Sequence, residues 1–112
     1  MILLPVLMFY ISLIQSGSTT PAIIRDYIAT EAIISNVNPQ LAISIATAES
    51  KLNPNAIGDH GTSMGLWQIH LPAHASVSPE NARSVVYSTE WAVNQLKEGN
   101  CQIWSTCPIR DD

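Results

Sequence analysis

Hydrophobic and polar positions divide the chain into an uncharged apolar start, several segments with helical periodicity, and one long irregular stretch. Apolar residues recur at helical spacing after residue 21, after residue 39 and again before residue 99, as in amphipathic helices. Residues 53–74 are instead rich in Gly, Asn, Asp, His, Ser and Pro, with a short apolar core at residues 66–69. This pattern predicts a mainly α fold with a short β-like region.

Capping residues mark the ends of the predicted helices. Thr20-Pro21 and Asn38-Pro39 each pair a good N-cap with a proline at the first helical position. The second of these helices is expected to run to about Ser50, where Asn53-Pro54 stops it. Residues 78–80, Ser-Pro-Glu, mark a further helical turn.

The last predicted helix is capped by Ser88 or Thr89 and ends before Gly99. It carries an apolar set at helical spacing. The members of this set are Trp91, Ala92, Val93 and Leu96.

The apolar run at residues 2–14 contains no charged side chain, but it is shorter than the roughly 20 residues that a membrane-spanning helix needs. It fits the hydrophobic region of a secretory signal, and residues 16–18, Ser-Gly-Ser, supply the small residues of a cleavage site. Because no Lys or Arg follows Met1, an uncleaved N-terminal membrane anchor is an alternative. A buried first helix of a cytosolic protein is another, against which Pro5 and the abrupt change to polar residues argue.

We therefore expect residues 1–18 to be a signal peptide or N-terminal anchor and residues 19–112 to form one exported domain, located in the periplasm, outside the cell or in the cell envelope. A chain of 112 residues leaves no room for two domains. The net charge of −4, with no basic stretch, argues against nucleic-acid binding. We expect a monomer without a cofactor. Because the net charge is negative, overall charge would not attract the protein to an anionic cell wall, and a groove would have to hold any such substrate.

Two cysteines, Cys101 and Cys107, bracket a short loop near the C-terminus. In an oxidising compartment they would join, and a loop of this size contributes roughly 2 kcal/mol of stability. Two free buried thiols are the alternative. The cysteine spacing is not that of a zinc site, and His60, His70 and His74 form no metal pattern, so we assign these histidines to loops and surface.

Glu49 is the most informative residue of the helix predicted at residues 39–50. It falls near the middle of an apolar arc, where a solvated glutamate is not expected. A carboxyl buried there favours its protonated form and could donate a proton to a glycosidic oxygen. The alternative is that Glu49 lies at a frayed helix end and reaches water. The arc is formed by Leu41, Ala42, Ile45, Ala46 and Ala48.

The irregular stretch adds residues suited to binding a sugar. Gly65 would permit close approach of the backbone to a ligand, Trp67 offers a ring face, and Gln68 offers both a donor and an acceptor. Each of these signals alone is weak, since a Trp is more often core and a lone Gln more often surface. A polar turn, Gly58-Asp59-His60-Gly61, precedes them.

Three motifs in order resemble the signature of the soluble lytic transglycosylases, which share their fold with goose-type lysozymes. The motifs are Ala48-Glu49-Ser50, Asn53-Pro54-Asn55-Ala56 and Gly65-Leu66-Trp67-Gln68-Ile69, and the resemblance runs from about residue 21 to residue 104. It implies an α+β lysozyme-like domain with a groove beside its β-like region. It also implies cleavage of the β-1,4 bond between N-acetylmuramic acid and N-acetylglucosamine in peptidoglycan.

The resemblance also implies roles for individual residues. Glu49 would be the general acid and then the base, and Ser50 would hold the substrate or the intermediate. Gly65, Leu66 and Gln68 would line the groove beside the acid, and Trp67 and Ile69 lie within the same motif.

Two positions depart from the family pattern. The family has Ala-x-x-Tyr on a late helix, where the tyrosine hydrogen-bonds the catalytic glutamate, and in this chain Gln95 stands in the place of that tyrosine. Asp59 lies where goose-type lysozymes carry an aspartate that positions water, so it is a candidate second carboxylate. Its alternative role is to cap its own turn.

These departures leave the product open. With Glu49 alone, the 6-hydroxyl of the substrate attacks and a 1,6-anhydro sugar forms, whereas a second carboxylate lets water attack. Two non-enzymatic functions are also alternatives: a peptidoglycan-binding module without turnover, motivated by Gln95, and a subunit of an envelope-assembly machine.

Overall fold

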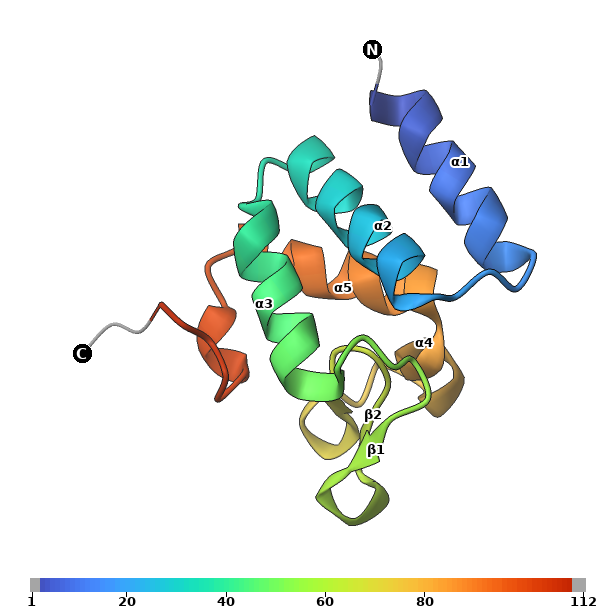
Figure 1. Ribbon diagram of the computed structural model, residues 1–112. Coiled ribbons are helices and arrows are strands. Elements are labelled where there is room, and N and C mark those ends of the chain that lie inside the picture. The colour runs from blue at the N-terminus through green and yellow to red at the C-terminus, as the bar shows by residue number, and fades with distance from the viewer. Residues whose placement is uncertain (1–2, 110–112) are drawn as a thin grey trace.

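The computed structural model describes residues 3–109 and shows a mainly helical domain with a small antiparallel sheet, so the predicted α+β class is confirmed (Figure 1). The sheet has the order β1-β2-β3, with Ile57 paired to Met64 and Met64 paired to Ile69. The helices are α1 (Leu3–Gln15), α2 (Pro21–Ile34), α3 (Pro39–Ser50), α4 (Pro79–Arg83) and α5 (Val85–Lys97), and the strands are β1 (Ile57–Gly58), β2 (Ser63–Met64) and β3 (Ile69–His70).

The predicted starts of α2 and α3 are confirmed. Thr20 Oγ1 accepts a hydrogen bond from the Ile23 amide at 3.3 Å, and Asn38 Oδ1 accepts one from the Gln40 amide at 2.9 Å. The end of α3 has a different cause from the one predicted. Lys51 caps the helix in the left-handed region at φ 54°, so the helix has stopped before Asn53-Pro54.

The predicted cap of the last helix is wrong. Ser84 caps α5, with its hydroxyl accepting from the Tyr87 amide at 3.1 Å. Ser88 and Thr89 lie inside α5 with completely buried side chains. The helix ends at Lys97, before Gly99, as predicted.

The core lies among α2, α3, α5 and the loop that carries β3, with α3 presenting Ala42, Ile45 and Ala46 to it. The predicted apolar arc of α3 was too wide, because Ala48 is exposed. At about 100° per residue, Ala48 points away from Ala46. Glu49 therefore lies at the edge of the buried face and is half-buried.

The N-terminal segment forms α1, which packs beside α2 (Figure 1). Leu7 and Ile14 are buried, while the Tyr10 hydroxyl donates to Asp26 Oδ2 at 3.4 Å. Among residues 3–109, no helix combines the length and apolar character needed to cross a membrane. The division at residue 18 into a leader and a domain stays a prediction.

Candidate active site

Glu49 lines a cavity of about 680 Å³. The cavity is walled by the C-terminal end of α3, the turn between β1 and β2, the segment around β3, and a C-terminal loop that includes residues 103–105. In Figure 1 the sheet region, with β1 and β2, lies beyond the C-terminal end of α3. The sequence-predicted residues that the cavity unites are Glu49, Asp59 and Gln68.

The carboxylate of Glu49 is held by a residue that the sequence motifs did not indicate. The Thr106 hydroxyl donates a hydrogen bond to Glu49 Oε2, with the two oxygens 2.5 Å apart. Gln95 does not take this role in the described part of the chain, because its Oε1 accepts from Asn100 Nδ2 at 3.0 Å. Thr106 stands in the loop closed by the Cys101–Cys107 disulfide. That disulfide was predicted and is confirmed, and it excludes the two free thiols.

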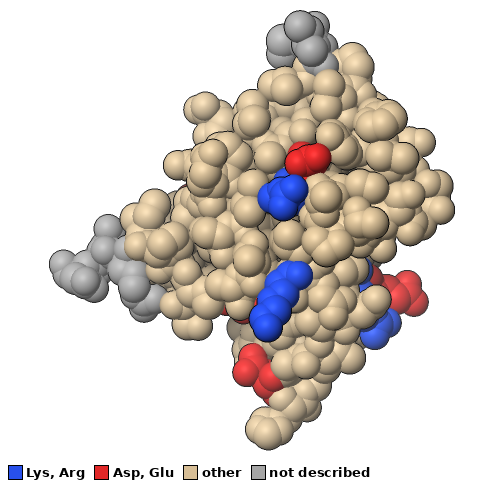
Figure 2. All heavy atoms as spheres, in the orientation of Figure 1, with Lys and Arg blue, Asp and Glu red and all other residues tan. Residues whose placement is uncertain are grey.

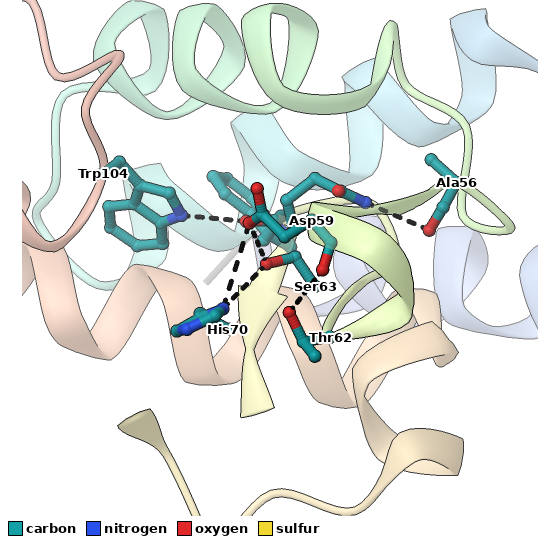
Figure 3. Close-up of polar contacts among 8 residues, drawn as sticks. Ala56, Asp59, Thr62, Ser63, His70 and Trp104 are labelled. Carbon is teal, nitrogen blue, oxygen red and sulfur yellow. Dashed lines mark hydrogen bonds and ion pairs between the residues drawn. The ribbon is translucent and has the colours of Figure 1, made fainter. Parts of the chain in front are cut away.

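Asp59 lies across the turn in a polar cluster with Ser63 and His70 (Figure 3). The buried Ser63 hydroxyl donates to Asp59 Oδ2 at 2.5 Å and lies 3.1 Å from His70 Nδ1. A hydroxyl has one proton, so His70 Nδ1 must be the donor to Ser63 Oγ when Asp59 is ionised. His70 Nδ1 also lies 3.9 Å from Asp59 Oδ2. The imidazole and the hydroxyl therefore hold this carboxylate in place.

Two histidines assigned to loops and surface line the cavity, which sequence reasoning missed. His70 is exposed, as a surface residue should be, but it faces Asp59. His74 packs edge-on against the Trp91 ring at 4.9 Å between centroids. His60 is exposed in the turn, as predicted. Within residues 3–109, no group of three or more His, Cys, Asp and Glu is arranged to hold a metal ion.

Gln68 reaches the cavity from a strained backbone position, with φ at 46°. Its Nε2 donates to the carbonyl oxygens of Ala56 and Gly65, both at 3.0 Å. A side-chain carbon at Gly58 would lie 2.5 Å from Gln68 Oε1, so the glycine makes room for the amide. The amide is therefore fixed in orientation.

The other residues of the Gly65–Ile69 motif are structural. The Trp67 ring is completely buried, so the predicted sugar platform is wrong, and Leu66 and Ile69 are buried with it. Gly65 allows a close approach of the backbone to the Ala82 carbonyl, and its predicted approach to a ligand stays a prediction. The aromatic residue at the cavity is Trp104, whose Nε1 donates to the Trp67 carbonyl at 2.9 Å (Figure 3).

Ser50 is also engaged with the protein itself. Its hydroxyl lies 2.7 Å from the Leu66 carbonyl and 3.1 Å from the Ala46 carbonyl, and it accepts from the Asn53 amide at 3.2 Å. Ser50 does not line the Glu49 cavity in the described chain. It ties the end of α3 to the Gly65–Ile69 segment, and its contact with substrate stays a prediction.

Comparison with known proteins shows the family to which this sequence belongs. Residues 26–105 match the sequence model of the transglycosylase SLT domain. No curated protein and no solved structure matches the chain. The match covers most of the chain and includes Glu49, Asp59 and Gln68, and it ends one residue before Thr106. The chain therefore belongs to the transglycosylase SLT domain family of lytic transglycosylases, which act on peptidoglycan in the cell envelope.

Proposed function

We propose that this protein cleaves the β-1,4 bond between N-acetylmuramic acid and N-acetylglucosamine in peptidoglycan, with Glu49 as general acid and then base. The observation that carries the proposal is the position of Glu49. It is a half-buried carboxyl at the edge of an apolar helix face, opening into a cavity of about 680 Å³. Family membership supplies the substrate class.

The chemistry needs two events at Glu49. The carboxylic acid first gives its proton to the glycosidic oxygen as the bond to the anomeric carbon breaks. The resulting carboxylate then takes a proton from the nucleophile that attacks this carbon. When that nucleophile is the 6-hydroxyl of the N-acetylmuramic acid, the products are a 1,6-anhydro sugar and a new free end, and no water is consumed.

The decisive variant is Glu49→Gln, which keeps the shape of the side chain but has no transferable proton. We expect its release of soluble muropeptides from purified peptidoglycan to fall by about 10²- to 10⁴-fold, the usual contribution of a general acid. Glu98→Gln, at an exposed carboxylate after α5, is the matched control and should keep wild-type release. Equal release by Glu49→Gln and wild type would refute the role of Glu49.

A second candidate is a hydrolase in which Asp59 directs water to the sugar. The observation in its favour is that Asp59 lines the same cavity as Glu49 and is held by Ser63 beside His70. Mass spectrometry of the muropeptides separates the two reactions. Anhydro products, lighter by one water, indicate the transglycosylase, and ordinary reducing ends indicate the hydrolase.

The same assay tests the non-enzymatic functions. A binding module would sediment with insoluble peptidoglycan and release nothing, and an assembly subunit would in addition co-purify with envelope proteins. We favour the enzyme because the cavity retains a carboxyl together with a hydrogen-bond donor that orients it.

We infer that the chain works outside the cytoplasm. Peptidoglycan lies in the envelope, and the Cys101–Cys107 disulfide is suited to an oxidising compartment. Export through residues 1–18, an anchoring role for the same segment and a monomeric state are part of this proposal.

A further inference from the structure

The C-terminal loop brings Thr106 to Glu49 across 57 positions of sequence. Thr106 lies beyond the segment that matches the family, so family membership assigns it no role. Gln95, the residue that stands in the place of the family's tyrosine, is engaged with Asn100. The Glu49 carboxylate is thus held from a part of the chain that the family pattern does not describe.

Contacts on both sides of Thr106 fix its position. The Cys101–Cys107 disulfide closes the loop with its Cα atoms 5.7 Å apart, and both sulfur-bearing residues are buried. The Cys107 amide donates to the Trp104 carbonyl at 3.1 Å, and the Trp104 amide donates to the Cys101 carbonyl at 3.1 Å. The Trp104 indole is bonded in turn to the Trp67 carbonyl in the core. The loop is therefore a rigid support for one hydroxyl.

We propose that Thr106 is a positioning residue for Glu49 and that the Cys101–Cys107 disulfide keeps it in place. The Thr106 hydroxyl has one proton and directs it at Glu49 Oε2, which leaves Oε1 to carry the proton that is transferred. After the transfer, the same hydrogen bond stabilises the carboxylate that acts as the base. This inference rests on the proposed function, because it assigns Thr106 a task only if Glu49 is the acid.

The activity test compares Thr106→Val, which keeps the shape but lacks the hydroxyl, with Thr106→Ser, which keeps the hydroxyl. We expect Thr106→Val to lower kcat by about 10- to 100-fold with little change in KM, and Thr106→Ser to restore most of the rate. Thr47→Val, an exposed threonine of α3, is the control and should behave as wild type. Wild-type kcat in Thr106→Val would overturn the proposal.

The pH dependence gives a readout that simple destabilisation would not move. A hydrogen bond to a carboxylate favours its ionised form, so its loss favours the protonated acid. The basic limb of the pH–rate profile should therefore shift to higher pH in Thr106→Val and return in Thr106→Ser. A limb that stays in place would contradict the proposal.

NMR of the Glu49 side-chain carboxyl carbon tests Thr106 without using activity. At a fixed pH its resonance should move in Thr106→Val and return in Thr106→Ser, and an unchanged resonance overturns the proposed hydrogen bond. If Glu49→Gln kept wild-type activity while this resonance moved, the proposed function would fail and the Thr106 contact would stand. The two failures are thus distinguishable.

The disulfide is tested by the double variant Cys101→Ser/Cys107→Ser. Its kcat should fall toward that of Thr106→Val, and its pH–rate profile should shift in the same direction. Wild type treated with a reductant should do the same and recover on reoxidation. Circular dichroism shows whether the helices remain folded. An unshifted profile in a folded double variant would overturn the role of the disulfide.

Discussion

Gly65 stands where the backbone around the sheet meets α4. Its φ is +85°, and a side-chain carbon there would lie 1.9 Å from the Ala82 carbonyl oxygen. Only a glycine satisfies both the left-handed conformation and the contact. The residue thus joins the segment that carries Gln68 to the next helix.

We predict that Gly65→Ala lowers the free energy of unfolding by at least about 3 kcal/mol, because strain and overlap with the Ala82 carbonyl act together. Gly61→Ala is the matched control. Its φ is +94°, but nothing lies within 4 Å of the added carbon, so we expect a cost of about 1 to 2 kcal/mol from backbone strain alone. Denaturant unfolding measures both. Equal losses would show that the Ala82 contact does not matter.

At this scale the sequence predicted the residues whose chemistry is unusual for their place in the pattern. Glu49 interrupts an apolar face, while Asp59 and Gln68 were predicted from the resemblance to lytic transglycosylases and goose-type lysozymes, and all three line one cavity. Thr106 could not, because its contact with Glu49 depends on tertiary packing across 57 residues. An aromatic residue in a motif also does not reveal its burial, and this is why Trp67 was misassigned.

Ser84 serves two helices at once, since it follows α4 and caps α5. Its hydroxyl accepts from the Tyr87 amide, which has no partner within the first turn of the helix. Ser84 is therefore the residue at which the chain leaves α4 and enters α5.

We predict that Ser84→Ala lowers the free energy of unfolding by about 1 kcal/mol, through loss of the cap. Ser84→Asp keeps an acceptor and adds a charge favourable at a helix N-terminus, so it should retain wild-type stability or exceed it. Thermal and denaturant unfolding provide the measurement. If the alanine and aspartate variants lost the same stability, the hydroxyl would not be acting as a cap.

Helix starts were predictable where a cap is followed by proline, as at Thr20-Pro21 and Asn38-Pro39. The start of α5 lacks this proline, and three serines and threonines compete for the cap within six positions. Packing decides among them, because Ser88 and Thr89 are buried against the rest of the domain. The Trp67 indole even donates to Thr89 Oγ1 at 3.1 Å.

The pH dependence of the stability of the whole molecule includes a contribution from Glu31, a carboxyl that does not line the Glu49 cavity. Burial, and secondarily the charge of Glu90, raise the pKa of Glu31 above its ordinary value of 4.5. Glu31 lies on α2 and Glu90 on α5. A raised pKa means that the folded protein favours the protonated carboxyl more than the unfolded chain does, so stability is lost as pH rises through the folded pKa.

We predict that Glu31→Gln is more stable than wild type at pH 7, because the variant has no carboxylate to bury beside Glu90. The gain should disappear as pH falls well below 4.5, where the wild-type carboxyl is protonated in both the folded and the unfolded state. Glu98→Gln removes the same charge at an exposed position and should change stability less. Denaturant unfolding at several pH values tests this. A gain that persists at low pH would contradict ionisation of Glu31 as its cause.

Charged side chains are few over the face shown in Figure 2, as expected from a composition with 12% charged residues. In a chain with so few charges, the spacing of the apolar residues is the main signal of secondary structure. The mainly α fold class could therefore be predicted from that spacing. The packing of α1 on α2 could not be predicted from the sequence, because residues 2–14 carry no polar face to indicate which side is buried.

The three tryptophans of the chain lie close together, and one of them, Trp104, lines the cavity. The Trp104 ring centroid is 5.9 Å from that of Trp67 and 6.0 Å from that of Trp91. Because excitation passes readily between indoles this close, their emission reports on a single environment. We therefore expect the ultraviolet fluorescence of the protein to change when a ligand fills the Glu49 cavity beside Trp104, without an added label.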